Sequence, residues 1–390
     1  MSTQSFADLG VSPAVVAALA HRGIAEPFAV QKLVIADVLA GRDVLAKSPT
    51  GSGKTLAFGI PLVDRLDANG PKQAALVLAP TRELATQICE EIRAIAHARA
   101  LAVAAVYGGA GIEQQSKRAR RAHVIVATPG RLEDLIDRGA VRLDGIQVLV
   151  LDEADRMLDM GFRPAVDRIV ARTPRARQTL FFSATLDGEV GRLAAAYTRE
   201  PRHHEHKPAP ERRRDIDHHF VAVEHAAKLG QLVDVLSADD VERALVFVRT
   251  KRGADRLVKR LRSHGVEAVG MHGDKTQGQR EKALARFQNG ACGVLVATDV
   301  AARGLDVDDI SHVVHFDAPA DRDSYVHRAG RTGRAGRSGS SITFVMAEQA
   351  ADVSRFAGEL SLHREFSASG LGGAPSRARR ARARRRGSRR

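Results

Sequence analysis

The chain has 390 residues and a net charge of +14, with 44% hydrophobic and 27% charged residues. This length exceeds what one hydrophobic core organises, so we expect two domains, and the charge indicates a polyanionic partner such as nucleic acid. Two cysteines exclude a disulfide framework, and we find neither a leader pattern nor an apolar stretch of about twenty residues, so we expect a soluble cytoplasmic protein without a membrane partner.

Short apolar segments alternate with helical patterns through the first half of the chain. These segments are residues 44–46, 75–79, 103–106, 124–127, 148–151 and 179–182. The alternation predicts a parallel β-sheet with helices on both faces. We therefore expect a first α/β domain over residues 1–200.

Residues 201–216 interrupt this pattern. Three prolines stand among charged residues and histidines without periodicity, which predicts a solvated linker. His203, His204 and His206 have no ligand partners at a fixed spacing, so no zinc site is expected.

The alternation of strand-like and helix-like segments resumes in the second half, at residues 220–223, 244–248, 266–270, 294–297 and 312–316. It predicts a second α/β domain over residues 217–362, without a Gly-Lys-Thr loop of its own. Residues 363–390 are rich in Ser, Gly, Ala and Arg and are expected to form a disordered basic tail. Nine arginines and no acid lie in residues 377–390, which leaves +5 for the rest of the chain.

A glycine-rich loop follows the first strand-like segment. Residues 51–55 read Gly-Ser-Gly-Lys-Thr, between a predicted strand and a predicted helix start. In this context the backbone N–H groups of Gly51, Ser52 and Gly53 are expected to surround a nucleotide β-phosphate. Lys54 would reach the β- and γ-oxygens, and the Thr55 hydroxyl would bind Mg²⁺.

An acidic pair follows the apolar segment 148–151. Asp152 is expected to bind Mg²⁺ partly through water, and Glu153 to orient or deprotonate the attacking water. Alone, such a pair is usually a solvated loop. Together with the glycine-rich loop it predicts an enzyme that hydrolyses ATP.

Further motifs accompany these two. They are residues 79–84 (Ala-Pro-Thr-Arg-Glu-Leu), 108–109 (Gly-Gly), 128–131 (Thr-Pro-Gly-Arg), 152–155 (Asp-Glu-Ala-Asp), 183–185 (Ser-Ala-Thr), 298–306 (Thr-Asp-Val-Ala-Ala-Arg-Gly-Leu-Asp) and 325–334. With them, the chain resembles the DEAD-box RNA helicases, ATP-dependent enzymes of superfamily two, over residues 5–348. The resemblance implies two RecA-like domains, each a mostly parallel sheet with helices on both faces. It also implies that ATP and RNA close these domains, which unwinds short duplexes or remodels RNA–protein complexes.

The resemblance implies roles for residues outside the phosphate loop as well. Gln31 would read adenine and Phe6 would pack on it, although Ile24 and Phe28 stand where the family usually has Phe and Thr. The remaining implied roles are nucleotide contacts by Pro49, Thr50, Asp299 and Asp306, catalysis by His327 with the arginine fingers Arg331 and Arg334, and coupling by Asp155, Ser183 and Thr185. The implied RNA contacts are Arg82, Gly109, Thr128, Arg131, Arg249, Gln277, Arg280 and Thr298, which suit phosphate and sugar rather than base edges.

Two alternatives remain. One is a DNA helicase or translocase of the same superfamily. The features that argue against it are Gln31, Phe6 and the Asp-Glu-Ala-Asp sequence. The other is a non-hydrolysing RNA clamp gated by ATP, against which Glu153 and the arginine fingers argue. A monomer is expected, and the arginine-rich tail is hypothesised to tether the enzyme to RNA through counterion release.

Overall fold

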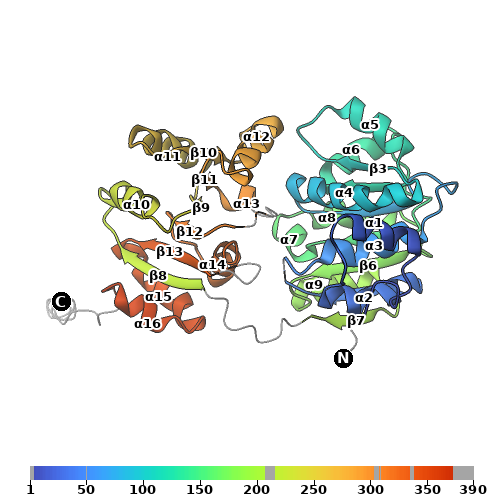
Figure 1. Ribbon diagram of the computed structural model, residues 1–390, viewed down its shortest axis with the longest axis horizontal. Helices are drawn as coiled ribbons and strands as arrows, with labels where there is room; N and C mark the ends of the chain where they lie inside the picture. Colours follow the sequence, from blue (N-terminus) through green and yellow to red (C-terminus); the bar gives the residue numbers. More distant parts are fainter. Residues whose placement is uncertain are drawn as a thin grey trace, which may run out of the picture. The chain divides into compact units, whose positions relative to one another are not determined.

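The computed structural model describes residues 4–49, 51–206, 216–302, 307, 309–333 and 338–371. The chain forms two compact units, residues 1–209 and 210–390 (Figure 1). Each unit is built on one sheet in which all strand pairs that the structure describes are parallel. This agrees with the predicted pair of α/β domains.

The sheet of the first unit has the strand order β3-β4-β2-β5-β6-β1-β7. Its strands are β1 (Val44–Lys47), β2 (Ala75–Leu78), β3 (Val103–Val106), β4 (Val124–Ala127), β5 (Val148–Leu151), β6 (Gln178–Ser183) and β7 (Arg202–Glu205). Ala75 of β2 lies opposite Val124 of β4 and Val148 of β5, so the three strands begin level with one another. Six of the seven strands lie within two residues of the segments that the sequence predicts.

Helices cover both faces of this sheet (Figure 1). One face packs on α1 (Pro13–His21), α2 (Ala29–Leu39), α3 (Lys54–Arg65) and α4 (Arg82–Ala96), and the other on α5 (Ile112–Arg121), α6 (Pro129–Asp137), α7 (Ala154–Asp159), α8 (Arg163–Ala171) and α9 (Gly188–Tyr197). Alternate residues of a strand enter opposite cores: Val148 and Val150 face the first, Leu149 and Leu151 the second. Strands buried on both faces explain why their sequences are continuously apolar.

The seventh strand corrects one boundary drawn from the sequence. Residues 202–205, assigned to the linker, form β7, which pairs in parallel with β1. His204 is anchored there, because its Nε2 lies 2.8 Å from Asp37 Oδ2. Pairing at a sheet edge uses backbone groups, so polar residues join without an apolar pattern.

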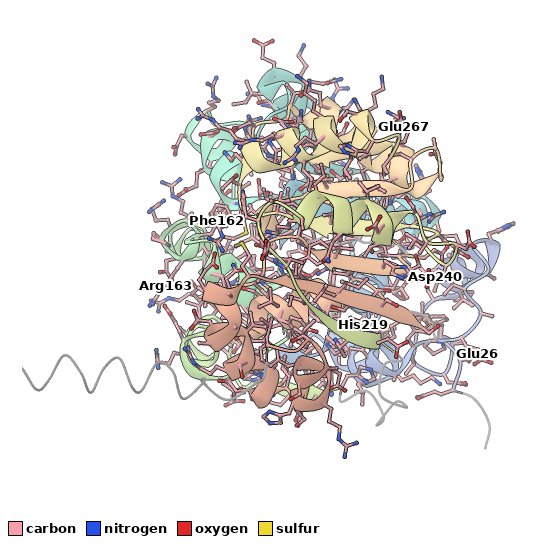
Figure 2. All side chains as sticks on the ribbon, turned by 90° about the vertical axis from the view of Figure 1, so that its left-hand side faces the viewer. Glu26, Phe162, Arg163, His219, Asp240 and Glu267 are labelled. Carbon is pink, nitrogen blue, oxygen red and sulfur yellow. The ribbon has the colours of Figure 1, made fainter. Side chains whose placement is uncertain are left out.

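The sheet of the second unit has the order β10-β11-β9-β12-β13-β8. Its strands are β8 (Ile216–Ala222), β9 (Ala244–Phe247), β10 (Ala268–Met271), β11 (Val294–Ala297), β12 (His312–His315) and β13 (Gly339–Val345), and its helices are α10 (Lys228–Leu236), α11 (Lys251–Ser263), α12 (Gln277–Gln288), α13 (Asp299–Ala302), α14 (Arg322–Ala329), α15 (Ala350–Glu359) and α16 (His363–Ala368). The seven-residue strand β13, which the sequence analysis missed, pairs along its whole length with β8. Along β8, exposed Asp217 and His219 alternate with less exposed neighbours. Figure 2 labels His219.

The helix α16 corrects a second boundary. Its residues were assigned to the disordered tail, but Phe366 is buried against Phe220, with ring centroids 5.5 Å apart. One aromatic ring therefore holds a segment whose other residues are polar or small. Residues 372–390, which include all nine tail arginines, lie outside the described residues. Along the described ranges, no helix is both long and apolar enough to span a bilayer.

Candidate functional site

The predicted site residues of the first unit leave the carboxyl ends of its parallel strands, which share one edge of the sheet. The loops after β1, β5 and β6 hold the glycine-rich, Asp-Glu-Ala-Asp and Ser-Ala-Thr motifs, and those after β2, β3 and β4 hold Arg82, Gly109 and Thr128. The strand order therefore places nucleotide residues on one half of the edge and predicted RNA residues on the other. This edge is where ligands bind in open α/β sheets.

The glycine-rich loop has the backbone of a phosphate cradle. Gly51 and Gly53 have φ values of +77° and +86°, which residues other than glycine rarely adopt. The loop is tied to itself by Ser48 Oγ and Ser52 Oγ, 2.6 Å apart, and Ser52 Oγ donates to the Pro49 carbonyl at 2.9 Å. Helix α3 then begins at Lys54, so its free N–H groups lie at the loop. Thr50 lies outside the described residues.

The Lys54 amine and the Asp152 carboxyl are both buried beside this loop. Lys54 Nζ donates to the Ser48 carbonyl at 3.0 Å, and Asp152 Oδ1 accepts from the Glu153 N–H at 3.0 Å. Burial raises the pKa of Asp152 to about 7, while the nearby Lys54 charge opposes that rise. A buried carboxyl that is costly to ionise suits a divalent cation, which would stabilise its charged form.

Glu153 is held in an unusual conformation. Its φ is +50°, although it is not glycine, and its carboxylate lies 3.4 Å from Arg156 Nε. Helix α7 starts at the next residue, so this left-handed residue joins the end of β5 to the first turn of α7. Left-handed backbone at a non-glycine residue is common at functional sites.

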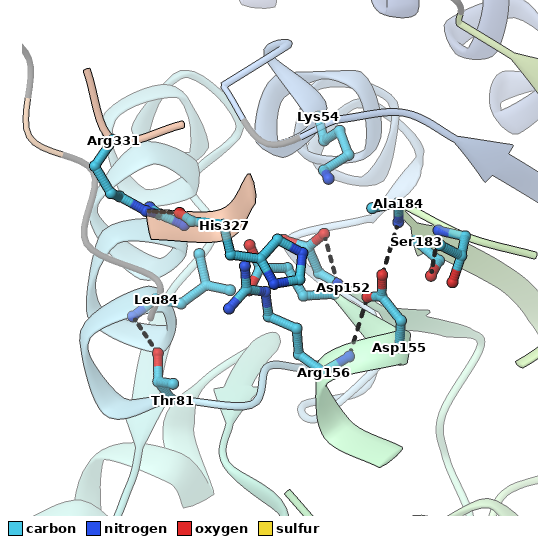
Figure 3. Close-up of polar contacts among 12 residues, drawn as sticks. Lys54, Thr81, Leu84, Asp152, Asp155, Arg156, Ser183, Ala184, His327 and Arg331 are labelled. Atoms are coloured by element: carbon cyan, nitrogen blue, oxygen red, sulfur yellow. Dashed lines mark hydrogen bonds and ion pairs between the residues drawn. The ribbon is translucent and has the colours of Figure 1, made fainter. Parts of the chain in front are cut away.

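Asp155 connects two motifs directly. Its Oδ1 accepts from the Arg156 N–H at 3.0 Å and its Oδ2 from the Ala184 N–H at 3.2 Å (Figure 3). Ser183 Oγ accepts from the Thr185 N–H, and the Ser183 carbonyl accepts from the Ser48 N–H. The Asp-Glu-Ala-Asp, Ser-Ala-Thr and glycine-rich segments thus form one hydrogen-bonded array.

The predicted adenine residues are placed differently from one another. Gln31 is 1% exposed and lies against the glycine-rich loop, since its Nε2 donates to the Gly53 carbonyl at 3.1 Å. Phe6 is 2% exposed and belongs to the core with Leu9 and Val15. Both side chains have little exposed surface in this structure, so the adenine contacts of Gln31 and Phe6 stay predictions.

The predicted RNA residues of the first unit follow three neighbouring strands, β3, β4 and β2. The Arg82 guanidinium lies over Gly108 and Gly109, where an added Cβ would contact it, and Gly109 has φ of +85°. Arg131 Nη1 donates to the Ala110 carbonyl at 2.9 Å. Thr128 stands at the start of α6, but its side chain makes no capping bond. Two guanidiniums and a helix start therefore line this half of the edge.

In the second unit, Asp299 has a partner that the sequence analysis did not assign. Arg328 binds it through two hydrogen bonds, of 2.6 and 2.7 Å, donates to the Asp317 carbonyl at 2.7 Å and lies 5.0 Å from the Phe247 ring centre. The predicted nucleotide contact by Asp299 thus involves a carboxylate already held in an ion pair. The only signal in the sequence was Arg328's place in the motif at residues 325–334.

The remaining predicted residues of the second unit lie at strand ends, on α12, or on and just after α14. Arg331 Nε donates to the His327 carbonyl at 3.3 Å (Figure 3), and the Arg249 N–H donates to Asp317 at 2.8 Å. The others are Gln277, whose amide donates to Glu281 at 3.0 Å, and Arg280 and Thr298, which are largely buried. Asp306 and Arg334 lie outside the described residues.

Comparisons with known proteins match both units. A family model described as DEAD/DEAH box helicase matches residues 28–193, and one described as helicase conserved C-terminal domain matches residues 227–336. The ATP-dependent RNA helicase CshA of Limosilactobacillus reuteri is 43% identical over 87% of this chain and 69% of its own length. CshA of Streptococcus pneumoniae serotype 4 is 43% identical over 87% of this chain and 65% of its own. The chain thus spans about two thirds of these relatives.

A solved structure of S. cerevisiae Dbp5 bound to RNA and ADP BeF3 is also similar. It is 28% identical to this chain, with a TM-score of 0.82, and the match covers 95% of this chain and 100% of that one. The likeness therefore extends through both units.

Proposed function

The chain belongs to the family of DEAD-box ATP-dependent RNA helicases, and on this premise we propose that it hydrolyses ATP in response to RNA and locally unwinds short duplexes or remodels RNA–protein complexes. The observation that carries the proposal is the shared edge of the first sheet, where phosphate-binding and acidic loops lie beside loops lined by guanidiniums. A nucleotide and a sugar-phosphate strand can bind along such an edge at the same time.

The residues present fit ATP with Mg²⁺. The positive φ values of Gly51 and Gly53 direct backbone N–H groups toward one phosphate, and Lys54 can exchange its bond to the Ser48 carbonyl for a phosphate oxygen. Thr55 and Asp152 would hold Mg²⁺, in part through water. The cation would supply charge neutralisation on the β- and γ-phosphates.

Catalysis by this chain's own residues would then be mainly positioning. Glu153 would accept a proton from the attacking water or orient it, while Arg156 fixes the Glu153 carboxylate. The roles of His327, Arg331 and Arg334 in stabilising the transition state rest on their motif, as do the contributions of Asp299 and Asp306. Domain closure as the coupling step is likewise part of the proposal.

RNA recognition would use groups that read the backbone. Arg82, Arg131 and the Gly109 N–H would contact phosphates from the first unit, and Arg249, Gln277, Arg280 and Thr298 from the second. Guanidiniums and amides contact phosphates whatever the base, so binding would be independent of sequence. Preference for RNA over DNA would rest on the 2′-hydroxyl.

One assay tests this function. ATP turnover is measured without nucleic acid, with RNA and with DNA of the same sequence, using Lys54→Ala and Glu153→Gln as controls. Strong stimulation by RNA alone, lost in both variants, supports the proposal. Stimulation by DNA alone would indicate a DNA translocase, and RNA binding without turnover a clamp.

The tail is proposed to add a sequence-independent RNA tether. Deleting residues 377–390 removes nine arginines but leaves Phe366 and α16 intact. RNA affinity should fall, and its salt dependence should flatten by about 0.7 in log–log slope for each phosphate that the shortened protein no longer neutralises. An unchanged slope would reject the tether. We further propose that the protein is a monomer. Because both cysteines are free and buried, we also propose a reducing compartment such as the cytoplasm.

A further inference from the structure

A large aromatic side chain lies exposed beside the glycine-rich loop. Phe28 is 61% exposed, whereas Phe6, Phe58, Phe181 and Phe182 in the same unit are buried. Across the residues that the structure describes, the other large exposed apolar side chains are Leu33, Val300 and Val326, so Phe28 is the one aromatic among them. A single exposed apolar side chain is ordinary on a protein surface, so the inference depends on where this ring lies, beside the glycine-rich loop.

The Phe28 ring is positioned by contacts with two site residues. A Cβ added to Gly53 would lie 2.7 Å from Phe28 Cδ2 and 2.8 Å from Gln31 Nε2, so ring and carboxamide both lie against the last loop residue before α3. The Phe28 N–H donates to Gln31 Oε1 at 2.9 Å. Because Phe28 is the residue before the first turn of α2, this bond fixes the ring and the carboxamide relative to each other.

Gln31 keeps the hydrogen-bonding capacity that an adenine needs. Its Oε1 accepts one bond, from Phe28, and its Nε2 donates one, to Gly53. An amide oxygen has a second lone pair and an amide nitrogen a second hydrogen, which match the N6 donor and N7 acceptor of adenine. A base paired in this way would lie close to the Phe28 ring.

We propose that the Phe28 ring forms one wall of the nucleotide pocket and packs on the base of bound ATP. The inference rests on the proposed function and assigns a substrate contact at a position where the sequence departs from its family. Ile24, the second departure, is aliphatic and only partly buried. Phe28 would thus supply the stacking surface that Ile24 cannot and that buried Phe6 does not expose.

Measuring the affinities for ATP, GTP and inorganic tripolyphosphate tests whether Phe28 packs on the base. Phe28→Ala and Phe28→Thr keep the backbone N–H that bonds to Gln31 but remove the ring. ATP affinity should fall on the order of tenfold, as expected for the loss of one base–aromatic stack. GTP affinity should fall by a similar factor because stacking does not distinguish bases. Affinity for inorganic tripolyphosphate, which has no base, should not change.

Kinetics and fluorescence give independent readouts. In RNA-stimulated turnover, the KM for ATP should rise while kcat stays near that of the unsubstituted protein. The chain has no tryptophan, so Phe28→Trp introduces a single tryptophan, whose emission ATP should quench and tripolyphosphate should not. Leu33→Trp is the matched control: it lies on α2, is 41% exposed and is five residues, or about 140°, around the helix from Phe28, so ATP should leave its emission unchanged.

The outcomes separate this inference from the proposed function. If the unsubstituted protein binds ATP and the ATP affinity of Phe28→Ala is within twofold of it, the proposed contact between Phe28 and the base is rejected. The proposed function is then unaffected. Equal weakening of ATP and tripolyphosphate would also reject it, because the substitution would then act through the loop. If the unsubstituted protein binds no ATP, both fail together.

Discussion

Replacing Asp152 with asparagine should stabilise the protein while abolishing turnover, and the stabilisation should depend on pH. The Asp152 carboxyl is buried at the end of β5, and burial raises its pKa from 3.8 to about 7. Between these values the unfolded chain has lost this proton and the folded protein retains it. Unfolding then releases a proton, so stability falls as pH rises from about 4 to about 7.

The size of this effect follows from the shift in pKa. At 1.36 kcal/mol per pH unit, the difference between 3.8 and about 7 corresponds to about 4 kcal/mol. Asparagine has a similar shape and does not ionise, so the stability of Asp152→Asn does not fall by this amount as pH rises. For a unit of this size, about 2–4 °C per kcal/mol gives a gap in melting temperature on the order of 10 °C at pH 8.

The assay is thermal unfolding of both proteins between pH 4.5 and 8. Groups common to the two proteins cancel in the difference, so the gap should open as pH rises and level off above pH 7. Mg²⁺ with ADP should narrow it, since a cation stabilises ionised Asp152. Asp159→Asn, at an exposed position of α7, should open no such gap. A gap that is equal at pH 5 and pH 8 would refute the reasoning.

Two further predictions concern other parts of the site. Gly109→Ala should reduce RNA-stimulated turnover about tenfold without changing ATP affinity, because its φ is +85° and the new Cβ would displace Arg82, a group worth about 1–2 kcal/mol in a phosphate contact. Gly111→Ala, where an added Cβ meets no atom within 4 Å, is the control, and equal effects of the two would contradict the assignment. Arg328→Gln should destabilise the second unit by about 3 kcal/mol, because Asp299 loses both of its hydrogen bonds to Arg328. The control is Arg322→Gln, in an exposed ion pair, which should change stability by less than about 1 kcal/mol. Thermal melting curves of the two variants measure the difference.

The sheet and its binding edge could be predicted because the motifs directly follow buried strands. Leu149, Val150 and Leu151 have no exposed surface, and Asp152 comes next, so an apolar segment ending in an acidic residue marks a strand end. The same reasoning placed Gly51 and Thr128 at the ends of other strands. Since parallel strands share one carboxyl edge, local patterns were sufficient to group these residues.

Features that depend on distant partners could not be predicted in this way. Asp299 is bound by Arg328, 29 residues away, and no local pattern indicates that pair. The strand β7 is held by backbone pairing, and α16 by the single ring of Phe366, so neither has a periodic apolar pattern. Phe6 has the chemistry of a base contact, but packing around α1 buries it.

The strand order also sets how strongly two negatively charged ligands would repel each other. From β2, which precedes the Arg82 loop, to β1, which precedes the glycine-rich loop, there are three strand spacings, or about 14 Å. Counterions at physiological ionic strength screen charges beyond about 8 Å. Triphosphate and polynucleotide can therefore occupy neighbouring halves of one edge with little mutual penalty, and in dilute buffer, where screening reaches about 30 Å, each would begin to disfavour the other.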